Sequence, residues 1–218
     1  MQSRKYTAFK KSRKLGDVYG GRRWAKRTDN IHARFHSLTA PSPGTELPIV
    51  LRENPSRALF FPLNPSEVVA ALQAIPDGAA ESLTHVWFRR IRAADVRSGD
   101  LPLAKFICGS GVRVIVLYPW RRDLRRYVGK KSPKGPFANS LRKYAGSPIL
   151  DSQGWYYQFT HDGLRRYYLE QLLLHELGHH VDWYRRHWSK ANGRGVEAAA
   201  NNYAVEWANS GVVEFVLE

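Results

Sequence analysis

The hydrophobic positions of this chain fall into short blocks, separated by turn sequences, from about residue 45 onwards. Four of these blocks are rich in β-branched and aromatic residues and predict strands, at residues 84–91, 112–118, 147–150 and 155–160. The second block is apolar enough for a central strand. Residues 151–154 form a turn sequence between the last two blocks, so a hairpin is predicted there.

Three further blocks predict helices, at residues 65 to about 75, 162 to about 188, and 196 to 209. Asn64, Pro65 and Glu67 supply an N-cap, a first-turn proline and a capping-box glutamate for the first helix. The second helix is expected to have Asp162 as its N-cap and to stop at residues 192 and 193. It is apolar nearly all round in its first half, which predicts burial. This order of elements predicts an α+β domain whose sheet packs on the helices.

The composition excludes several classes of protein. The chain has 218 residues, of which one is cysteine, so neither a disulfide scaffold nor a Cys-rich zinc site is possible. No apolar run is long enough to span a bilayer, and no apolar segment of an export signal follows the basic start. We therefore expect a cytoplasmic protein with no membrane partner.

The net charge of +15 is concentrated in two segments. Residues 1–34 contain 11 Lys and Arg against 2 acidic residues, and residues 121–143 contain 9 against 1. From residue 144 to the end the balance inverts, to 6 basic and 9 acidic residues. Residues 1–44 are therefore interpreted as a basic, flexible arm, residues 45–218 as the folded domain, and residues 121–143 as a basic loop of that domain.

Clustered positive charge of this kind favours non-specific binding of nucleic acid, because such binding needs little besides neutralised phosphates. The alternative is a solvated arm and a solvated loop, since no nucleic-acid-binding motif accompanies the charge. The candidate contacts are Arg22, Arg23, Arg121, Arg122, Lys130 and Lys131.

The chemically informative residues lie on the second predicted helix, in the sequence His175-Glu176-Leu177-Gly178-His179. Histidines four residues apart project from one face of a helix, and both can reach one zinc ion at about 2.0–2.1 Å. Glu176 is rotated by about 100° from His175 and can take a proton from water held by the metal. This is the His-Glu-x-x-His arrangement of zinc peptidases. The alternative is a surface helix, which the predicted burial disfavours.

A catalytic zinc ion normally has three protein ligands, so a third ligand is expected downstream. A histidine six residues after His179 is absent, because that position is Arg185, and the loop that follows the helix offers Arg194 instead. SprT-like proteases use a histidine in this loop, so their pattern is not met. Glu197 lies on the last predicted helix, 18 residues after His179, among small residues, whereas Glu206 is a rival without such neighbours.

Residues 172–204 resemble the gluzincin zinc peptidases, most closely the small ImmA/IrrE-like members. In these a Glu-x-x-Ala-Asn-x-aromatic-Ala helix follows the His-Glu-x-x-His helix. The resemblance implies a zincin-like fold, with a small twisted mixed sheet packed on the active-site helix and on a following glutamate-bearing helix. It makes Glu197 the third ligand of one Zn²⁺ per chain, and it places Asn201 where a side chain orients the first histidine.

The function expected from the motif and this resemblance is that of a zinc-dependent metalloendopeptidase with Glu176 as general base. Because ImmA/IrrE-like proteins act on DNA-bound regulators, the protein substrate is expected to be associated with nucleic acid. The strand at residues 155–159 is the expected site for pairing with an extended substrate. The alternative function is a nucleic-acid-binding protein whose metal site is structural or vestigial.

Other polar residues near the motif have two interpretations each. Asp182 either supports a ligand histidine or forms an ion pair with Arg185 or Arg186, and the ion pair is slightly favoured. His180 faces away from the ligand pair and is expected in the core or beside the site. Tyr203 and His161 are candidate donors to a transition state.

Overall fold

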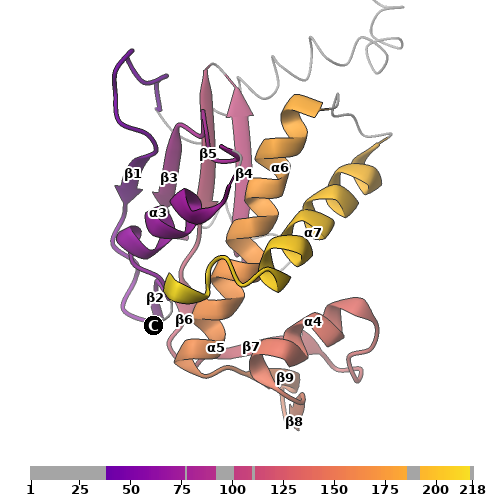
Figure 1. The fold of residues 1–218 in the computed structure, drawn as a ribbon. Helices are drawn as coiled ribbons and strands as arrows, with labels where there is room; N and C mark the ends of the chain where they lie inside the picture. Colours follow the sequence, from indigo (N-terminus) through magenta and orange to yellow (C-terminus); the bar gives the residue numbers. More distant parts are fainter. Residues whose placement is uncertain (1–37, 77, 92–100, 110, 186–191, 217–218) are drawn as a thin grey trace, which may run out of the picture.

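The computed structural model describes residues 38–76, 78–91, 101–109, 111–185 and 192–216, with the side chains of residues 184 and 185 left out. Most of the predicted arm, with Arg22 and Arg23, lies outside these residues. The described part contains three small sheets, of four, three and two strands, and a group of helices (Figure 1). This is the α+β class that the order of elements predicts.

The larger sheet has four strands in the order β1-β3-β5-β4. These strands are β1 (Ile49–Arg52), β3 (His85–Phe88), β5 (Val112–Leu117) and β4 (Ala104–Gly109). The first three are parallel, and β4 is antiparallel to β5 and forms one edge of the sheet. The sheet is therefore mixed, with β5 as one of its two central strands, as predicted for the apolar block at 112–118.

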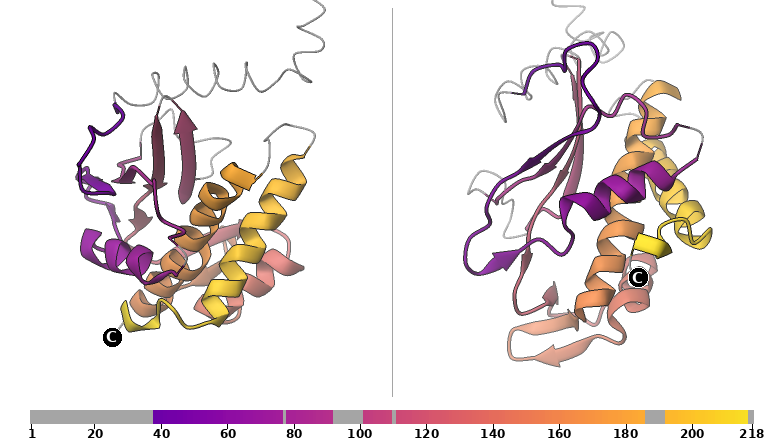
Figure 2. Two further views of the ribbon diagram at one scale, coloured as in Figure 1. Left: turned by 45° about the horizontal axis from the view of Figure 1, so that its top comes forward. Right: turned by 60° about the vertical axis from the view of Figure 1, so that its left-hand side comes forward.

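The two faces of the sheet carry alternate residues of β5. Ile115 and Leu117 belong to the main core, together with Leu173 and Leu177 from the long helix. Val114 and Val116 lie in a second buried cluster on the opposite face, to which Leu38, Leu51 and Ile91 pack. Helices cover the first face: α3 (Pro65–Ala74), α6 (Leu174–Arg185) and α7 (Gly193–Asn209) all lie on that side (Figure 2).

The capping box predicted for α3 is confirmed. The Asn64 side chain accepts a hydrogen bond from the Glu67 N–H at 3.0 Å, and the Glu67 carboxylate accepts one from the Asn64 N–H at 2.6 Å. Ile75 ends the helix in an extended conformation, as the Pro76 that follows it requires.

The long helix consists of three consecutive segments. They are α5 (His161–Arg166), the π-helix η3 (Tyr167–Leu173) and α6. The N-cap is Thr160, whose hydroxyl accepts the Gly163 N–H at 3.0 Å, so the prediction of Asp162 is wrong by two residues. Thr160 takes this role because its backbone is extended, whereas Asp162 already lies inside the first helical turn. The predicted end near residue 188 lies outside the described residues.

A second sheet has three antiparallel strands in the order β7-β9-β8. They are β7 (Arg125–Gly129), β9 (Gly154–Gln158) and β8 (Ile149–Asp151). The predicted hairpin is confirmed as β8 and β9, and its turn is held by Asp151, whose carboxylate accepts the N–H groups of Gln153 and Gly154.

The basic segment 121–143 is not the loop that its composition suggests. Its first part contributes to two strand pairs. β6 (Trp120–Arg121) pairs with β2 (Leu59–Phe60), and β7 pairs with β9. Its second part begins α4 (Pro136–Ala145), which buries Ala138, Leu141 and Tyr144. The prediction of a loop was wrong because it was based on the local composition, whereas these strands and this helix depend on contacts with distant segments. No helix of the described residues is long and apolar enough to cross a membrane.

Candidate metal centre

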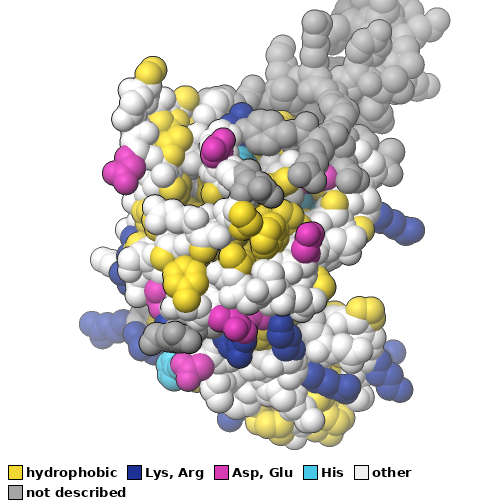
Figure 3. All heavy atoms as spheres, in the orientation of Figure 1, with side chains coloured by type: hydrophobic (Ala, Val, Ile, Leu, Met, Phe, Trp, Pro, Cys, Tyr) yellow, Lys and Arg dark blue, Asp and Glu magenta, His cyan; other side chains and the backbone are white. Residues whose placement is uncertain are grey.

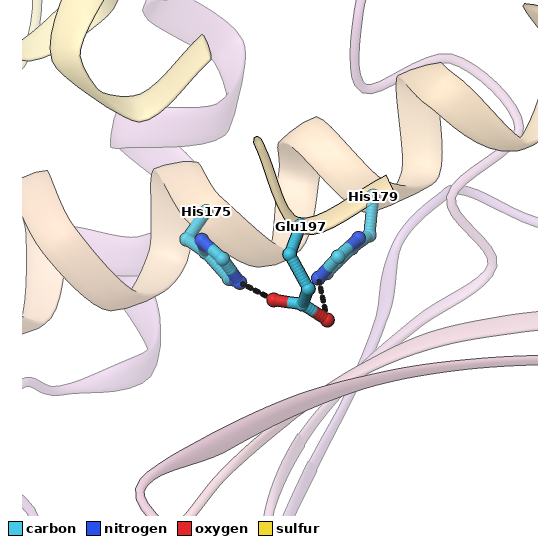
Figure 4. Close-up of side chains that lie close together, drawn as sticks. All are labelled: His175, His179 and Glu197. Atoms are coloured by element: carbon cyan, nitrogen blue, oxygen red, sulfur yellow. Dashed lines mark ion pairs between the residues drawn. The ribbon is translucent and has the colours of Figure 1, made fainter. Parts of the chain in front are cut away.

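Three side chains predicted as metal ligands come together between α6 and α7. His175 and His179 project from one side of α6 toward the carboxylate of Glu197, which comes from the first turns of α7 (Figure 4). The Nε2 atom of His175 lies 3.5 Å from one oxygen of Glu197, and the Nε2 atom of His179 lies 3.7 Å from the other. All three ligand atoms lie within 4.8 Å of one another.

Two of these separations are close to those of a tetrahedral zinc site. Zinc bonds of about 2.0–2.1 Å place two ligand atoms of a tetrahedron about 3.4 Å apart. The two separations between histidine and glutamate, 3.5 and 3.7 Å, are close to that value. The Glu197 side chain is largely exposed, so water reaches the carboxylate.

Both histidines have the protonation state that a metal ligand requires. Burial lowers the pKa of His179 to about 4, with a smaller contribution from His175. Burial also lowers the pKa of His175, although Glu197 and Asn201 oppose the shift. The two imidazoles are therefore neutral at pH 7, with a nitrogen lone pair available for a metal.

Asn201 contacts His175. The Nδ1 atom of His175 lies 3.1 Å from the Asn201 side-chain oxygen, which can only accept a hydrogen bond. The proton of the neutral imidazole is therefore on Nδ1, and the lone pair of Nε2 points toward Glu197. Asn201 is on α7 one turn after Glu197, so the same helix supplies the ligand and the residue that orients another ligand.

The close approach of α6 and α7 depends on Gly178, the residue before His179. A Cβ atom at Gly178 would lie 2.9 Å from the Ala200 Cα, 3.1 Å from the Ala200 oxygen and 3.0 Å from the Tyr203 Cβ. Only hydrogen atoms fit in that space. The glycine within the motif and the small residues of α7 thus bring Glu197 within reach of the two histidines.

The Glu176 side chain reaches the edge strand of the larger sheet. Its carboxylate accepts the N–H of Phe106, in the middle of β4, at 2.6 Å. The side chain is buried, and this burial raises the pKa of Glu176 to about 8, although the hydrogen bond from Phe106 opposes the shift. An acidic side chain with a raised pKa, one residue from a candidate metal ligand, can exchange a proton near neutral pH.

The other predicted neighbours of the site have separate roles. His180 is buried, its Nε2 lies 3.0 Å from the Glu81 carbonyl oxygen, and its ring meets the Phe106 ring edge-on, so it joins α6 to the sheet. Asp182 is also buried, and the side chains of its predicted partners, Arg185 and Arg186, lie outside the described residues.

Neither His161, a candidate donor to the transition state, nor Glu206, the rival ligand, lies near the ligand cluster. His161 is at the start of α5, 14 residues before His175, which is about 21 Å along a helix, and its ring packs on Phe60. Glu206 is exposed and lies 9 residues after Glu197, or about 13 Å along α7. Tyr203 lies closer, beside Gly178, and its ring packs on Trp207.

The prediction that an extended substrate pairs with residues 155–159 is wrong for Trp155 and Tyr156. Residues 155–159 include most of β9, which is the central strand of its sheet and pairs with β7 and β8 on its two sides. β8 pairs with Gly154, Trp155 and Tyr156, so an added strand is excluded at these three residues. The edge strand beside the candidate site is β4, which the hydrophobic pattern did not predict.

The sequence also did not predict the anchor of the long helix. Glu170 lies in η3 and is buried, and its carboxylate accepts hydrogen bonds from Lys143 at 2.6 Å, Tyr144 at 3.1 Å and Arg166 at 3.1 Å. The sequence feature that could have indicated this anchor is an acidic residue within a mostly apolar block. Its contacts tie the helix that bears the ligands to α4.

The candidate contacts for nucleic acid differ in their surroundings. Arg121 is paired with Asp123 at 2.8 Å, and Arg122 donates to the Arg57 carbonyl oxygen at 2.8 Å. Lys130 and Lys131 are exposed in the connection between β7 and α4. Most Lys and Arg side chains visible in Figure 3 lie on the lower half of that face.

Comparisons of this chain with protein-family models, with curated proteins and with solved structures find no match. The chemical interpretation of the site therefore depends on the residues themselves. They offer two neutral imidazoles and one carboxylate to a metal ion, beside a buried carboxylate that can carry a proton.

Proposed function

We propose that this protein is a zinc-dependent metalloendopeptidase of the gluzincin type. The observation that carries the proposal is the convergence of His175, His179 and Glu197, whose ligand atoms all lie within 4.8 Å of one another. These ligands come from two helices, so the spacing within one helix does not account for the arrangement. The mixed sheet, with its antiparallel edge strand beside the site, supports a zincin-like fold.

Each residue has a distinct role in this proposal. A bound zinc ion would supply Lewis acidity, which makes water acidic and polarises a carbonyl group. The Glu176 carboxylate takes a proton from the attacking water and delivers it to the leaving amine nitrogen. Asn201 holds His175 in the tautomer that leaves Nε2 free to bind metal. Burial of Glu176 keeps bulk water from competing for its proton.

The substrate of the proposed enzyme is an extended segment of protein. β4 is an edge strand, and the N–H of Phe106 on this strand reaches Glu176. A peptide added along this edge would present its backbone between β4 and the ligand cluster. Association of the substrate with nucleic acid through residues 1–34 stays a prediction from charge.

Metal analysis tests the ligand assignment. The protein purified without chelator should contain about one zinc ion per chain, and His179→Ala should contain little. His161→Ala is the matched control, because His161 is exposed and distant from the cluster, and it should retain zinc. Wild-type protein without a transition metal would contradict the proposal.

Glu176→Gln separates metal binding from catalysis. The amide cannot accept the proton, so cleavage of an unfolded protein substrate should fall by about 10²- to 10⁴-fold while the zinc content is unchanged. Unchanged cleavage by Glu176→Gln would remove Glu176 from the role of general base.

A further inference from the structure

A cavity of about 640 Å³ opens between the segment that leads into β4 and the elements β6, β7 and α4. Part of its wall is apolar, formed by Leu101, Leu103, Val128 and Phe137. The rest contains three arginines, Arg121, Arg125 and Arg126, and the residues that line the cavity include no acidic side chain. The cavity thus combines an apolar wall with positive charge.

The three arginines are not equivalent. Arg121 is paired with Asp123 at 2.8 Å, and Arg125 lies 3.9 Å from Asp151 and donates to Gln158 at 3.2 Å. Arg126 has no carboxylate partner among the described residues. Its Nη1 donates to the Tyr167 hydroxyl at 2.7 Å, and its guanidinium lies 5.0 Å from the centre of the Phe137 ring.

Arg126 is therefore positioned for an anion that comes from outside the chain. The side chain is partly buried, where a cation without a counterion is unfavourable. Its contacts with Tyr167 and Phe137 fix the plane of the guanidinium and use one of its five N–H donors. An oriented guanidinium binds a carboxylate through two parallel hydrogen bonds.

The cavity lies close to the candidate metal centre along the chain. Leu103, which lines the cavity, is three residues before Phe106, whose N–H reaches Glu176. At about 3.3 Å per residue, the cavity wall is about 10 Å along this segment from the contact with Glu176. A peptide extended along β4 spans that distance with three residues.

We propose that this cavity is a specificity pocket that binds an acidic side chain of the peptide substrate, two to four residues from the cleaved bond. This proposal rests on the proposed peptidase function. The carboxylate pairs with Arg126, and the apolar wall packs on the neighbouring substrate side chain. A nucleic-acid backbone fits less well, because successive phosphates need several uncompensated cations and the cavity has one such arginine.

The test uses pairs of ten-residue peptides that differ only in Glu or Gln at one position, scanned over four residues on each side of the cleaved bond. The wild type should prefer Glu at one position two to four residues from that bond. Arg126→Gln should raise KM for the Glu peptide roughly 10- to 100-fold and leave kcat and the Gln peptide unchanged. Arg126→Lys should restore part of the preference.

Arg122→Gln is the matched control, since Arg122 is exposed in the same segment and does not line the cavity. It should keep the preference. The melting temperature of each variant shows whether it is folded. The pocket proposal is overturned if the wild type prefers Glu at no position, or if Arg122→Gln loses the preference as Arg126→Gln does. Neither result contradicts the peptidase activity.

If no peptide is cleaved, the result counts against the proposed function. In that case a measurement of peptide binding tests the pocket independently of cleavage. A fluorescein-labelled Glu peptide should bind the wild type more tightly than its Gln counterpart, and Arg126→Gln should abolish the difference. Equal binding of both peptides overturns the proposal. Arg126-dependent binding of oligothymidylate without any binding of the Glu peptide also overturns it and assigns the cavity to nucleic acid.

Discussion

The metal cluster and the arginine cavity are built in different ways. The cluster joins side chains of α6 and α7, which Gly178 allows to pack almost backbone to backbone. The cavity is formed by four segments, and its central residue, Arg126, is held by side-chain contacts with Tyr167 and Phe137. Rigid helix packing fixes distances between ligand atoms, whereas a stacked arginine provides one oriented charge.

This difference indicates how each region should respond to mutation. A metal site requires all its ligands at once, so changes to the cluster or to the helix contact should have large effects. A pocket that adds one ion pair to substrate binding should tolerate changes with smaller losses. The following predictions test that ranking.

The largest effect is expected from Glu197→Ala. Residues that only support a metal ligand contribute 10- to 100-fold to affinity, so loss of a ligand should weaken zinc binding by more than about 100-fold. Competition with a chromophoric chelator measures the affinity. Glu206→Ala, on the same helix and exposed, should bind zinc as the wild type does. Equal affinity of the two variants would show that Glu197 is not a ligand.

Gly178→Ala tests the helix contact. The added methyl group would lie 2.9 Å from the Ala200 Cα, so α7 must move outward, at a cost of about 1–3 kcal/mol of folding free energy. Zinc affinity should fall as well, because Glu197 moves with α7. Gly193→Ala is the control, since nothing lies within 4 Å of its added Cβ. Urea unfolding and chelator competition measure the two effects.

Asn201→Ala should reduce zinc affinity by roughly 10- to 100-fold, because His175 loses the acceptor for its Nδ1 proton. Asn201→Asp keeps an acceptor and adds negative charge, so it should bind zinc at least as tightly as the wild type. Chelator competition on both variants gives the comparison. Identical affinity of Asn201→Ala and the wild type would assign Asn201 no part in orienting His175.

The smallest effect is expected from Phe137→Ala in the cavity. Phe137 is 51% exposed, so its loss should hardly change the free energy of unfolding. The cation–π contact with Arg126 contributes about 0.5–1 kcal/mol, so KM for the preferred acidic peptide should rise about two- to fivefold. Phe215→Ala, 53% exposed and away from the cavity, is the control. A loss of zinc in Phe137→Ala would contradict the separation of the two regions.

The parts of the site that the sequence predicts are those that local geometry determines. The four-residue spacing of His175 and His179 puts them on one helix face wherever that helix lies, and the capping box defines the start of α3 for the same reason. The contact between Glu197 and both histidines depends on tertiary packing. The resemblance to gluzincins suggested it, and periodicity alone could not.

The parts that were missed depend on contacts between distant segments. β1 has three apolar residues in a row, and in β4 the apolar residues Phe106, Ile107 and Cys108 are consecutive, so neither strand alternates between apolar and polar residues. Basic residues suggested a loop at 121–143, but β7 is stabilised by its pairing with β9. The cavity combines residues from 101 to 137, and no local pattern indicates that they share a wall.

The π-helix before the motif affects how this chain tolerates changes in length. In η3 the Leu174 N–H donates to the Leu169 carbonyl oxygen, five residues earlier, so each turn holds one residue more than an α-helix needs. Deletion of one residue within Tyr167–Leu173 can return this segment to α-helix without turning α6 relative to α5. The same deletion between His175 and His179 would rotate one histidine by about 100° away from the other. The direction in which the two histidines face is therefore preserved by a deletion in η3, whereas a deletion inside the motif separates them.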